Sequence, residues 1–192
     1  MTQNENDENW NLYVLRYDYS ANYYVGTNQD LKRRMGEHWK RTSTNQNLPK
    51  WSEKNHSTKG FRFYWFKVNE SGVSKKSADH CENCLAHKLV DQIKNLPVDI
   101  YVGSNKIFGR EETPIDEFEV IENKDNSINI DNEIDELFIN LNVLTCPKIK
   151  EDFSIKCYAI GHIGEYDEKR QYNKKFEKIA DFEYLAENEG LS

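Results

Sequence analysis

Hydrophobic and polar positions alternate near the start of the chain in two short runs separated by a polar turn. Residues 13–15 alternate as a strand does, residues 18–22 have turn composition, and residues 23–26 form a second run. This pattern predicts a β-hairpin. Thr27 and Asp30 then stand at the spacing of a capping box, and apolar residues follow at helical intervals, so we expect a helix over about residues 28–40.

Two later segments have an equally clear periodicity. Residues 61–68, FRFYWFKV, are the strongest strand candidate in the sequence. Between residues 77 and 94, apolar side chains recur every three or four positions, which predicts a packed helix. In the second half we expect an extended piece near 114–121, a helix over 133–141, and strands near 153–163 and 176–184.

These elements predict an α/β fold class of the α+β type with two units. A small antiparallel three-stranded sheet flanked by helices is expected over residues 10–104, and a second small acidic α+β domain over residues 105–192. We place the domain boundary between residues 105 and 125, where the composition of the sequence becomes acidic. Residues 1–9 are polar and are expected to form a disordered tail.

The composition is that of a globular chain without a membrane segment. The sequence has 192 residues, of which 37% are hydrophobic, and no run approaches the roughly 20 apolar residues that span a bilayer. The polar, acidic start is unlike a secretory signal, so we expect a cytoplasmic location and no membrane partner. Four unevenly spaced cysteines are too few for a disulfide framework in a chain of this length, so reduced thiols are expected.

The charge is divided unevenly between the two halves. The net charge is −7, but residues 1–104 contain 15 basic and 12 acidic side chains, for a net charge of +3. Residues 105–192 contain 11 basic and 21 acidic side chains, for a net charge of −10. A nucleic-acid partner is therefore compatible with the first half only, and we assign the acidic half to protein contacts, regulation or shielding.

Two tyrosines and two cationic residues gather around the predicted hairpin and helix. Tyr13 and Tyr24 lie on paired strands, although each alone is more simply explained by packing. Arg34 and His38 are four residues apart and so share a helix face. The guanidinium group of arginine is well suited to a two-pronged contact with phosphate.

Glu82 is the most informative charged residue of the second predicted helix. It precedes Ala86 by four residues and Leu89 by seven, which places a carboxylate on the apolar stripe. Burying a carboxylate is costly unless it is paired, hydrogen-bonded or bound to a metal ion. The alternative is that Glu82 has already reached solvent near the end of the helix.

Together these residues resemble the GIY-YIG nuclease family. The two tyrosine motifs of that family match residues 11–13 (NLY) and 24–26 (YVG). Arg34 follows the glycine of the second motif by eight residues, His38 follows four residues later, and Glu82 matches the single glutamate of the next helix. The resemblance covers about residues 10–100, and the combined spacing is specific. The chain departs from the pattern at Asn11 and Leu12, where the family has glycine and isoleucine.

The resemblance implies a divalent-metal-dependent endonuclease that hydrolyses DNA phosphodiester bonds. It implies that Tyr13 is the general base with Tyr24 as its hydrogen-bonding partner, that Arg34 clamps the scissile phosphate, and that His38 orients a phosphate or relays a proton. Glu82 would be the metal ligand for Mg²⁺ or Mn²⁺. A tyrosine can act as base only if nearby positive charge lowers its pKa from about 10. Further substrate contacts are expected from Gly26, Lys32, Arg33 and Asn95, although solvated surface charge is the simpler explanation of Lys32 and Arg33.

Three alternatives stay open. The same fold without catalysis would be a nucleic-acid or protein binding module, and the acidic half alone would suit an interaction protein that mimics DNA. The run from His80 to His87 contains Cys81 and Cys84 and suggests a zinc site, but Cys146 and Cys157 are remote in sequence and no second close pair follows.

Overall fold

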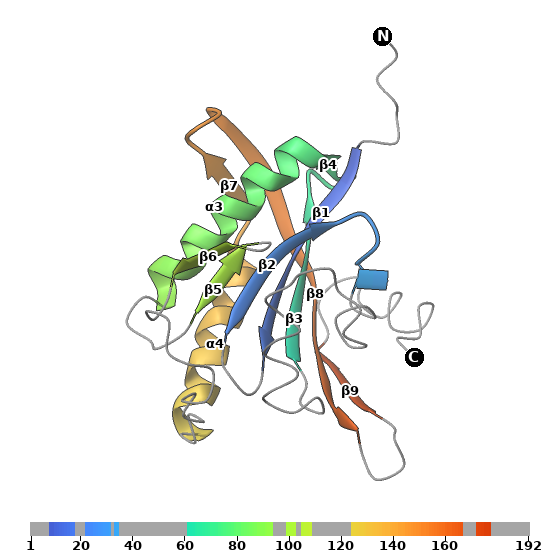
Figure 1. Ribbon diagram of the computed structural model, residues 1–192, viewed down its shortest axis with the longest axis vertical. Helices are drawn as coiled ribbons and strands as arrows, with labels where there is room; N and C mark the ends of the chain where they lie inside the picture. The colour runs from blue at the N-terminus through green and yellow to red at the C-terminus, as the bar shows by residue number, and fades with distance from the viewer. Residues whose placement is uncertain are drawn as a thin grey trace.

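The centre of the fold is a β-hairpin joined to a third strand, as the computed structural model shows (Figure 1). β1 (Glu8–Tyr17) pairs antiparallel with β2 (Tyr23–Asn28), and β3 (Phe61–Val68) pairs antiparallel with the other edge of β1. The predicted hairpin and the predicted strand over residues 61–68 are therefore confirmed. The structure describes residues 8–17, 22–31, 33–34, 61–93, 99–102, 105–108, 124–166 and 172–177.

The sheet continues on both sides of this group of three strands. On one side β5 (Ile100–Val102) runs parallel to β2 and pairs with β6 (Asn105–Phe108). On the other side β8 (Glu151–Tyr166) pairs antiparallel with β3 and also carries β7 (Val143–Cys146). The remaining short strands are β4 (Val73–Ser74), on β1, and β9 (Tyr172–Glu177), on β8.

The described strands thus form one curved, nine-stranded sheet with the order β6-β5-β2-β1-β3-β8-β7 along its main path. The mixed α+β class is as predicted, but the small three-stranded sheet is wrong. The reason is that β3 has a second free edge, and a long strand from the acidic half pairs with that edge.

Predictions for the second half have mixed outcomes. β8 contains the predicted strand over residues 153–163. The predicted boundary and the predicted strand over residues 176–184 fall largely on residues outside the described ones, and the extended piece near 114–121 lies there entirely.

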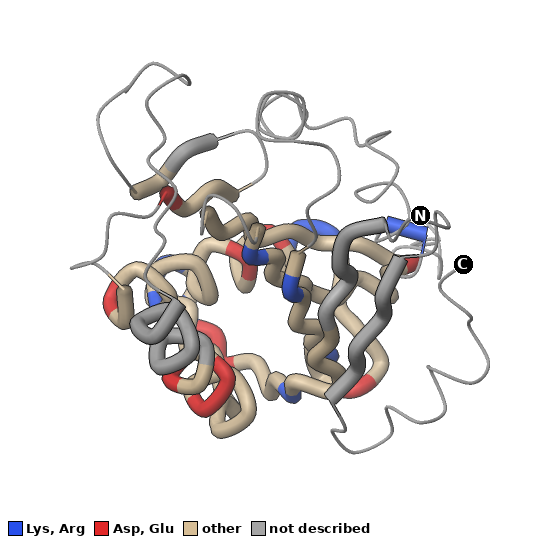
Figure 2. The backbone as a smooth tube through the Cα atoms, turned by 90° about the horizontal axis from the view of Figure 1, so that it is seen from below, with Lys and Arg blue, Asp and Glu red and all other residues tan. Residues whose placement is uncertain are grey.

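Two helices, α3 and α4, cover one face of the sheet. α3 (Lys75–Ile93) starts two residues before the predicted position, and its apolar stripe is buried against the sheet. α4 (Lys124–Asn140) starts nine residues earlier than the predicted helix, and its acidic positions are visible in red in Figure 2. Phe138 of α4 packs edge-on against the rings of Tyr64 and Phe66, with centroids 4.8 and 5.1 Å apart.

Strand alternation divides the buried side chains between the two faces of the sheet. Leu12 and Val14 of β1 lie in the cluster that contains the buried stripe of α3. Tyr13 and Leu15 lie in a second cluster that also contains Tyr24, Leu31, Phe63, Trp65 and Tyr158. We call the face that carries this second cluster the tyrosine face. In Figure 1, α3 and α4 lie on one side of the sheet and the short helical piece that begins at residue 31 lies on the other.

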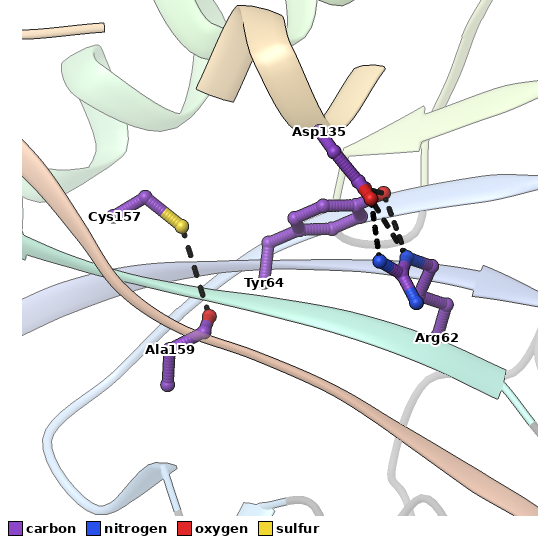
Figure 3. Close-up of polar contacts among 5 residues, drawn as sticks. All are labelled: Arg62, Tyr64, Asp135, Cys157 and Ala159. Carbon is purple, nitrogen blue, oxygen red and sulfur yellow. Dashed lines mark hydrogen bonds and ion pairs between the residues drawn. The ribbon is translucent and has the colours of Figure 1, made fainter. Parts of the chain in front are cut away.

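A buried polar network attaches α4 to β3. Asp135 accepts hydrogen bonds from Arg62 Nη2 at 2.6 Å and from the Tyr64 hydroxyl at 2.6 Å (Figure 3). Arg62 Nε lies 3.2 Å from both Asp135 Oδ1 and the Tyr64 hydroxyl oxygen. Burial, followed by the adjacent Asp135 carboxylate, raises the pKa of Tyr64, so the phenol stays protonated and donates its proton to the carboxylate. A helix of the acidic half is therefore held on a strand of the predicted nuclease half.

Candidate active site

Tyr13 and Tyr24 lie next to each other on the tyrosine face. They occupy adjacent strands, their ring centroids are 5.8 Å apart, and the ring planes are inclined by 45°. Tyr13 is 1% exposed and Tyr24 is 4% exposed. Because residues 13 and 24 both alternate away from α3, the two phenols share a site that is separate from the main core.

Gly26 leaves the space that the Tyr13 ring occupies. It is the direct cross-strand partner of Tyr13. A Cβ atom at residue 26 would lie 2.5 Å from Tyr13 Cζ and 2.6 Å from its hydroxyl oxygen, which is too close for any side chain. The Tyr13 ring can therefore occupy this position only because residue 26 is a glycine, and the contribution of Gly26 is steric.

Arg34 reaches this pair from the first turn of a helix, of which the structure describes residues 31, 33 and 34. Asp30 caps that turn, since its Oδ1 accepts a hydrogen bond from the Arg33 N–H at 3.0 Å, and the Arg34 N–H donates to the Asp30 carbonyl at 3.1 Å. The predicted capping box at Thr27 is wrong, because Thr27 still belongs to β2 and its hydroxyl accepts a hydrogen bond from Lys75 Nζ. The Arg34 side chain donates from Nε to Tyr13 Oη at 3.1 Å.

The Tyr13 phenol is protonated in this environment. Burial raises its pKa well above the usual value of 10.0, and the neighbouring Tyr24 raises it further. Arg34 lowers the pKa through its charge and its hydrogen bond, but this does not offset the burial. A general base needs a lowered pKa, so additional positive charge would be required for Tyr13 to act as one.

Glu82 lies on α3, whose buried stripe packs against the opposite face of the sheet. The charges that affect its pKa are those of Lys75 and Asp79, and it makes no hydrogen bond or ion pair with Tyr13, Tyr24 or Arg34 within the described residues. Lys75 connects the two regions, because its ammonium group binds Thr27, the residue after Gly26. Glu82 therefore lies on a helix attached to the same strand end as the tyrosine site, without touching the trio.

Burial changes the acidity of Glu82. The side chain is 9% exposed, and burial raises its pKa from 4.5 to about 7, while Lys75 lowers it and Asp79 raises it. Its carboxylate accepts no hydrogen bond within 3.5 Å in the described part of the chain. A carboxylate is the ligand type that a hard divalent cation such as Mg²⁺ prefers, and because the ion keeps most of its own waters it needs few protein ligands.

The other predicted site residues are less closely involved or cannot be placed. Arg33 is exposed, whereas the neighbouring Arg34 is half-buried. Lys32, His38 and Asn95 lie outside the residues whose side chains the structure describes. Of the predicted set, the structure brings together Tyr13, Tyr24, Gly26 and Arg34.

Two lysines on the tyrosine face were not found from the sequence. Lys67 of β3 and Lys156 of β8 are direct cross-strand partners, both are exposed, and Lys67 Nζ lies 5.0 Å from the centroid of the Tyr158 ring. The sequence contains one indication of their position, which is that Lys67 is two residues from Trp65 on the same strand. The two side chains therefore lie on the same face of the sheet. The pairing with β8, which places Lys156 beside it, has no signal in the sequence.

The described residues contain no cluster that identifies a metal ligand set, and no related protein indicates what binds at this site. Among the residues that the structure describes, no three or more His, Cys, Asp or Glu side chains are grouped so as to hold a metal ion. No helix in the described segments has the length and apolar character needed to cross a membrane. Comparisons with protein-family models, with curated proteins and with solved structures gave no match for this chain.

Proposed function

We propose that the chain is a divalent-metal-dependent endonuclease that hydrolyses DNA phosphodiester bonds at the site formed by Tyr13, Tyr24 and Arg34. The observation that carries the proposal is the hydrogen bond from Arg34 Nε to Tyr13 Oη beside a glycine that makes room for the phenol. Three separate elements, two strands and the start of a helix, thus supply a cation and two hydroxyl groups to one place.

Each of these side chains has a chemical task in the proposed reaction. The guanidinium group of Arg34 binds and neutralises the phosphate, and the hydrogen bond from its Nε to Tyr13 holds it beside the phenol. Tyr13, with Tyr24 beside it, orients the attacking water and takes its proton once bound positive charge has lowered the pKa of the phenol. Glu82 would hold Mg²⁺ or Mn²⁺, and a bound divalent ion supplies charge stabilisation for the phosphate and the departing oxygen.

The tyrosine face extends this site toward a polyanion. Lys67 and Lys156 are exposed cationic side chains on directly paired positions of this face, and ammonium groups bind the phosphate oxygens of a nucleic-acid backbone. The distance from β1 to β8 across the sheet is two strand spacings, or about 10 Å. Roughly three nucleotides of one DNA strand, at 3.4 Å each, cover the same distance. The two lysines are therefore in reach of the backbone of a strand bound at Arg34.

The test is a cleavage assay with supercoiled, branched and single-stranded DNA in Mg²⁺ or Mn²⁺. We expect the parent chain to cut, Arg34→Ala to lose about 100- to 1,000-fold in rate, and Glu82→Gln to be silent. Arg33→Ala removes the same charge one residue away and is expected to retain most activity. If the parent binds DNA but cuts none of these substrates with either ion, the chain is a non-catalytic binding module of the same fold.

A further inference from the structure

Three of the four cysteines meet between α3 and β7, although Cys146 is remote from the other two in sequence. Cys81 and Cys84 are three residues apart on α3, and Cys146 is the last residue of β7. The sulfur atoms of Cys84 and Cys146 are 2.8 Å apart, and Cys81 is near enough to influence the pKa of Cys146. The pairing of β7 with β8 is what brings Cys146 to the helix.

The three thiols differ in their access to solvent. Cys81 and Cys146 are 0% and 1% exposed, whereas Cys84 is half-buried. All four cysteines are free, and Cys157 lies apart from the cluster on β8, where its thiol faces the carbonyl of Ala159 at 3.7 Å (Figure 3). A small oxidant can therefore reach Cys84 first, and the thiol next to it is that of Cys146.

We propose that Cys84 and Cys146 form a redox-active pair that closes into a disulfide on reaction with a peroxide. The sulfur atoms need to approach by only about 0.8 Å to reach the bond length of roughly 2.05 Å. This inference rests on the positions of the thiols and does not depend on the proposed nuclease activity.

The reaction has two steps. Cys84 releases its proton and attacks one oxygen of hydrogen peroxide as the thiolate, the O–O bond breaks, and Cys84 becomes a sulfenic acid while the departing hydroxide takes up a proton and leaves as water. Cys146 then attacks the Cys84 sulfur, the S–O bond breaks, and a second water leaves with the thiol proton. In total two thiols give two electrons to one peroxide, and the products are one disulfide and two waters. A dithiol reductant reverses the change.

The disulfide would fix α3 to β7. α3 carries Glu82, and β7 is attached to the sheet through β8, so the cross-link closes a long loop between residues 84 and 146. Closing such a loop stabilises the folded chain relative to the unfolded chain. We expect the oxidised protein to unfold about 5–10 °C above the reduced protein.

The experiment treats the reduced full-length chain with one to five equivalents of hydrogen peroxide and maps the products by mass spectrometry of non-reduced peptides. We expect a loss of two free thiols, a linked pair of peptides that contains Cys84 and Cys146, and recovery of four thiols after treatment with dithiothreitol. Cys157→Ser should form the same link as the parent, and Cys84→Ala, at a half-buried position, should not form it while keeping the parent's circular dichroism spectrum.

The proposal is overturned if the linked peptide is absent, if Cys84 proceeds to a sulfinic acid, or if the link joins Cys81 to Cys84. A reduced chain that takes up one equivalent of Zn²⁺ and is thereby protected from peroxide would also overturn it, in favour of a thiolate metal site. These measurements are made on the parent chain, so they stand even if a cysteine variant fails to fold.

Discussion

The Nε atom of Arg34 donates a hydrogen bond to Tyr13 Oη across 3.1 Å, although the two residues are 21 positions apart. The contact joins the capped start of a helix to the middle of the central strand β1. The hydrogen bond from Nε also fixes one edge of the guanidinium group against the phenol. The position of the Arg34 cation beside the Tyr13 ring is therefore set by the folded chain itself.

The raised pKa of Tyr13 predicts how cleavage depends on pH. If the Tyr13 phenolate is the base, the active fraction of enzyme below the phenol pKa increases tenfold per pH unit. We expect log kcat/KM of the parent to rise with a slope near 1 between pH 6 and 9, where the phenol is still mostly protonated. Tyr13→Phe should lower the rate at least 100-fold and remove the slope. A parent rate independent of pH over this range would contradict the role of Tyr13 as base.

Gly26→Ala tests the packing of the Tyr13 phenol. Because the new Cβ would lie 2.5 Å from Tyr13 Cζ, the ring must leave its position, and the overpacking should cost about 1–3 kcal/mol in the free energy of unfolding. The measurement is urea denaturation. In a Tyr13→Ala background the same substitution should cost much less, and a double-mutant cycle gives the coupling. Equal costs in both backgrounds would show that the two residues do not oppose each other.

The sequence contained enough information for the elements that depend on local periodicity. The hairpin, the strand over residues 61–68 and helix α3 were all predictable, because their apolar residues repeat at the spacing of the element itself. The group of Tyr13, Tyr24, Gly26 and Arg34 was also predictable, since a hairpin followed directly by a helix leaves few arrangements in space.

What could not be predicted depends on long-range pairing. Nothing in residues 151–166 indicates that they pair with β3, so the size of the sheet and the position of Lys156 were hidden. The pairing of β7 with β8, which brings Cys146 to Cys84, and the contact of Asp135 with Arg62 were hidden in the same way. The electrostatics of Tyr13 were hidden for a different reason, because the pKa depends on how completely the ring is buried.

Lys67 and Lys156 are expected to contribute to DNA affinity without taking part in the chemistry. Removing one lysine–phosphate interaction lowers the steepness of log K against log salt by about 0.7–0.9, so Lys67→Gln combined with Lys156→Gln should lower it by about 1.4–1.8. The measurement is fluorescence anisotropy with labelled DNA over a range of NaCl concentrations.

A matched control for these lysines is available on the helix. Lys76 and Lys88 are exposed on α3, and changing both to glutamine removes the same two charges. If the two double variants show the same salt dependence, DNA affinity depends only on the net charge of the protein, and the tyrosine face is not a specific DNA-binding surface. If the slope falls for the first pair while the parent fails to cleave, DNA binding on this face stands and the nuclease proposal does not.

Asp135→Asn tests whether the acidic half is energetically part of the main sheet. The carboxylate binds Arg62 and Tyr64, and removing its charge leaves a guanidinium group at 8% exposure without this counter-charge. We expect a loss of about 3–5 kcal/mol in the free energy of unfolding, typical of a broken buried ion pair. Glu136→Gln changes the next residue of α4 and should cost less than about 0.5 kcal/mol. Similar values for the two variants would mean that the network contributes little.

Glu82 links the proposed metal site to a measurable pH dependence of stability. Its pKa is raised from 4.5 to about 7 in the folded chain, so the folded state binds the proton more tightly than the unfolded state. The stabilisation that this proton gives is fully present below about pH 4.5 and is lost as the pH rises through about 7. Glu82→Gln lacks this titration, so the variant should be about 1–3 kcal/mol more stable than the parent at pH 8 and similar to it near pH 4.5.

A divalent ion should reverse this difference. At pH 8 the Glu82 carboxylate is mostly ionised and lies at a largely buried position, so Mg²⁺ or Mn²⁺ bound there would stabilise the folded parent by mass action and raise its melting temperature. The same concentration of metal should leave Glu82→Gln unchanged, while Asp91→Asn, which alters an exposed acid on the same helix, should respond as the parent does. EDTA should restore the lower melting temperature. If all three proteins respond equally to the metal, Glu82 is not its ligand, and the buried carboxylate then destabilises the fold at neutral pH without a compensating cation.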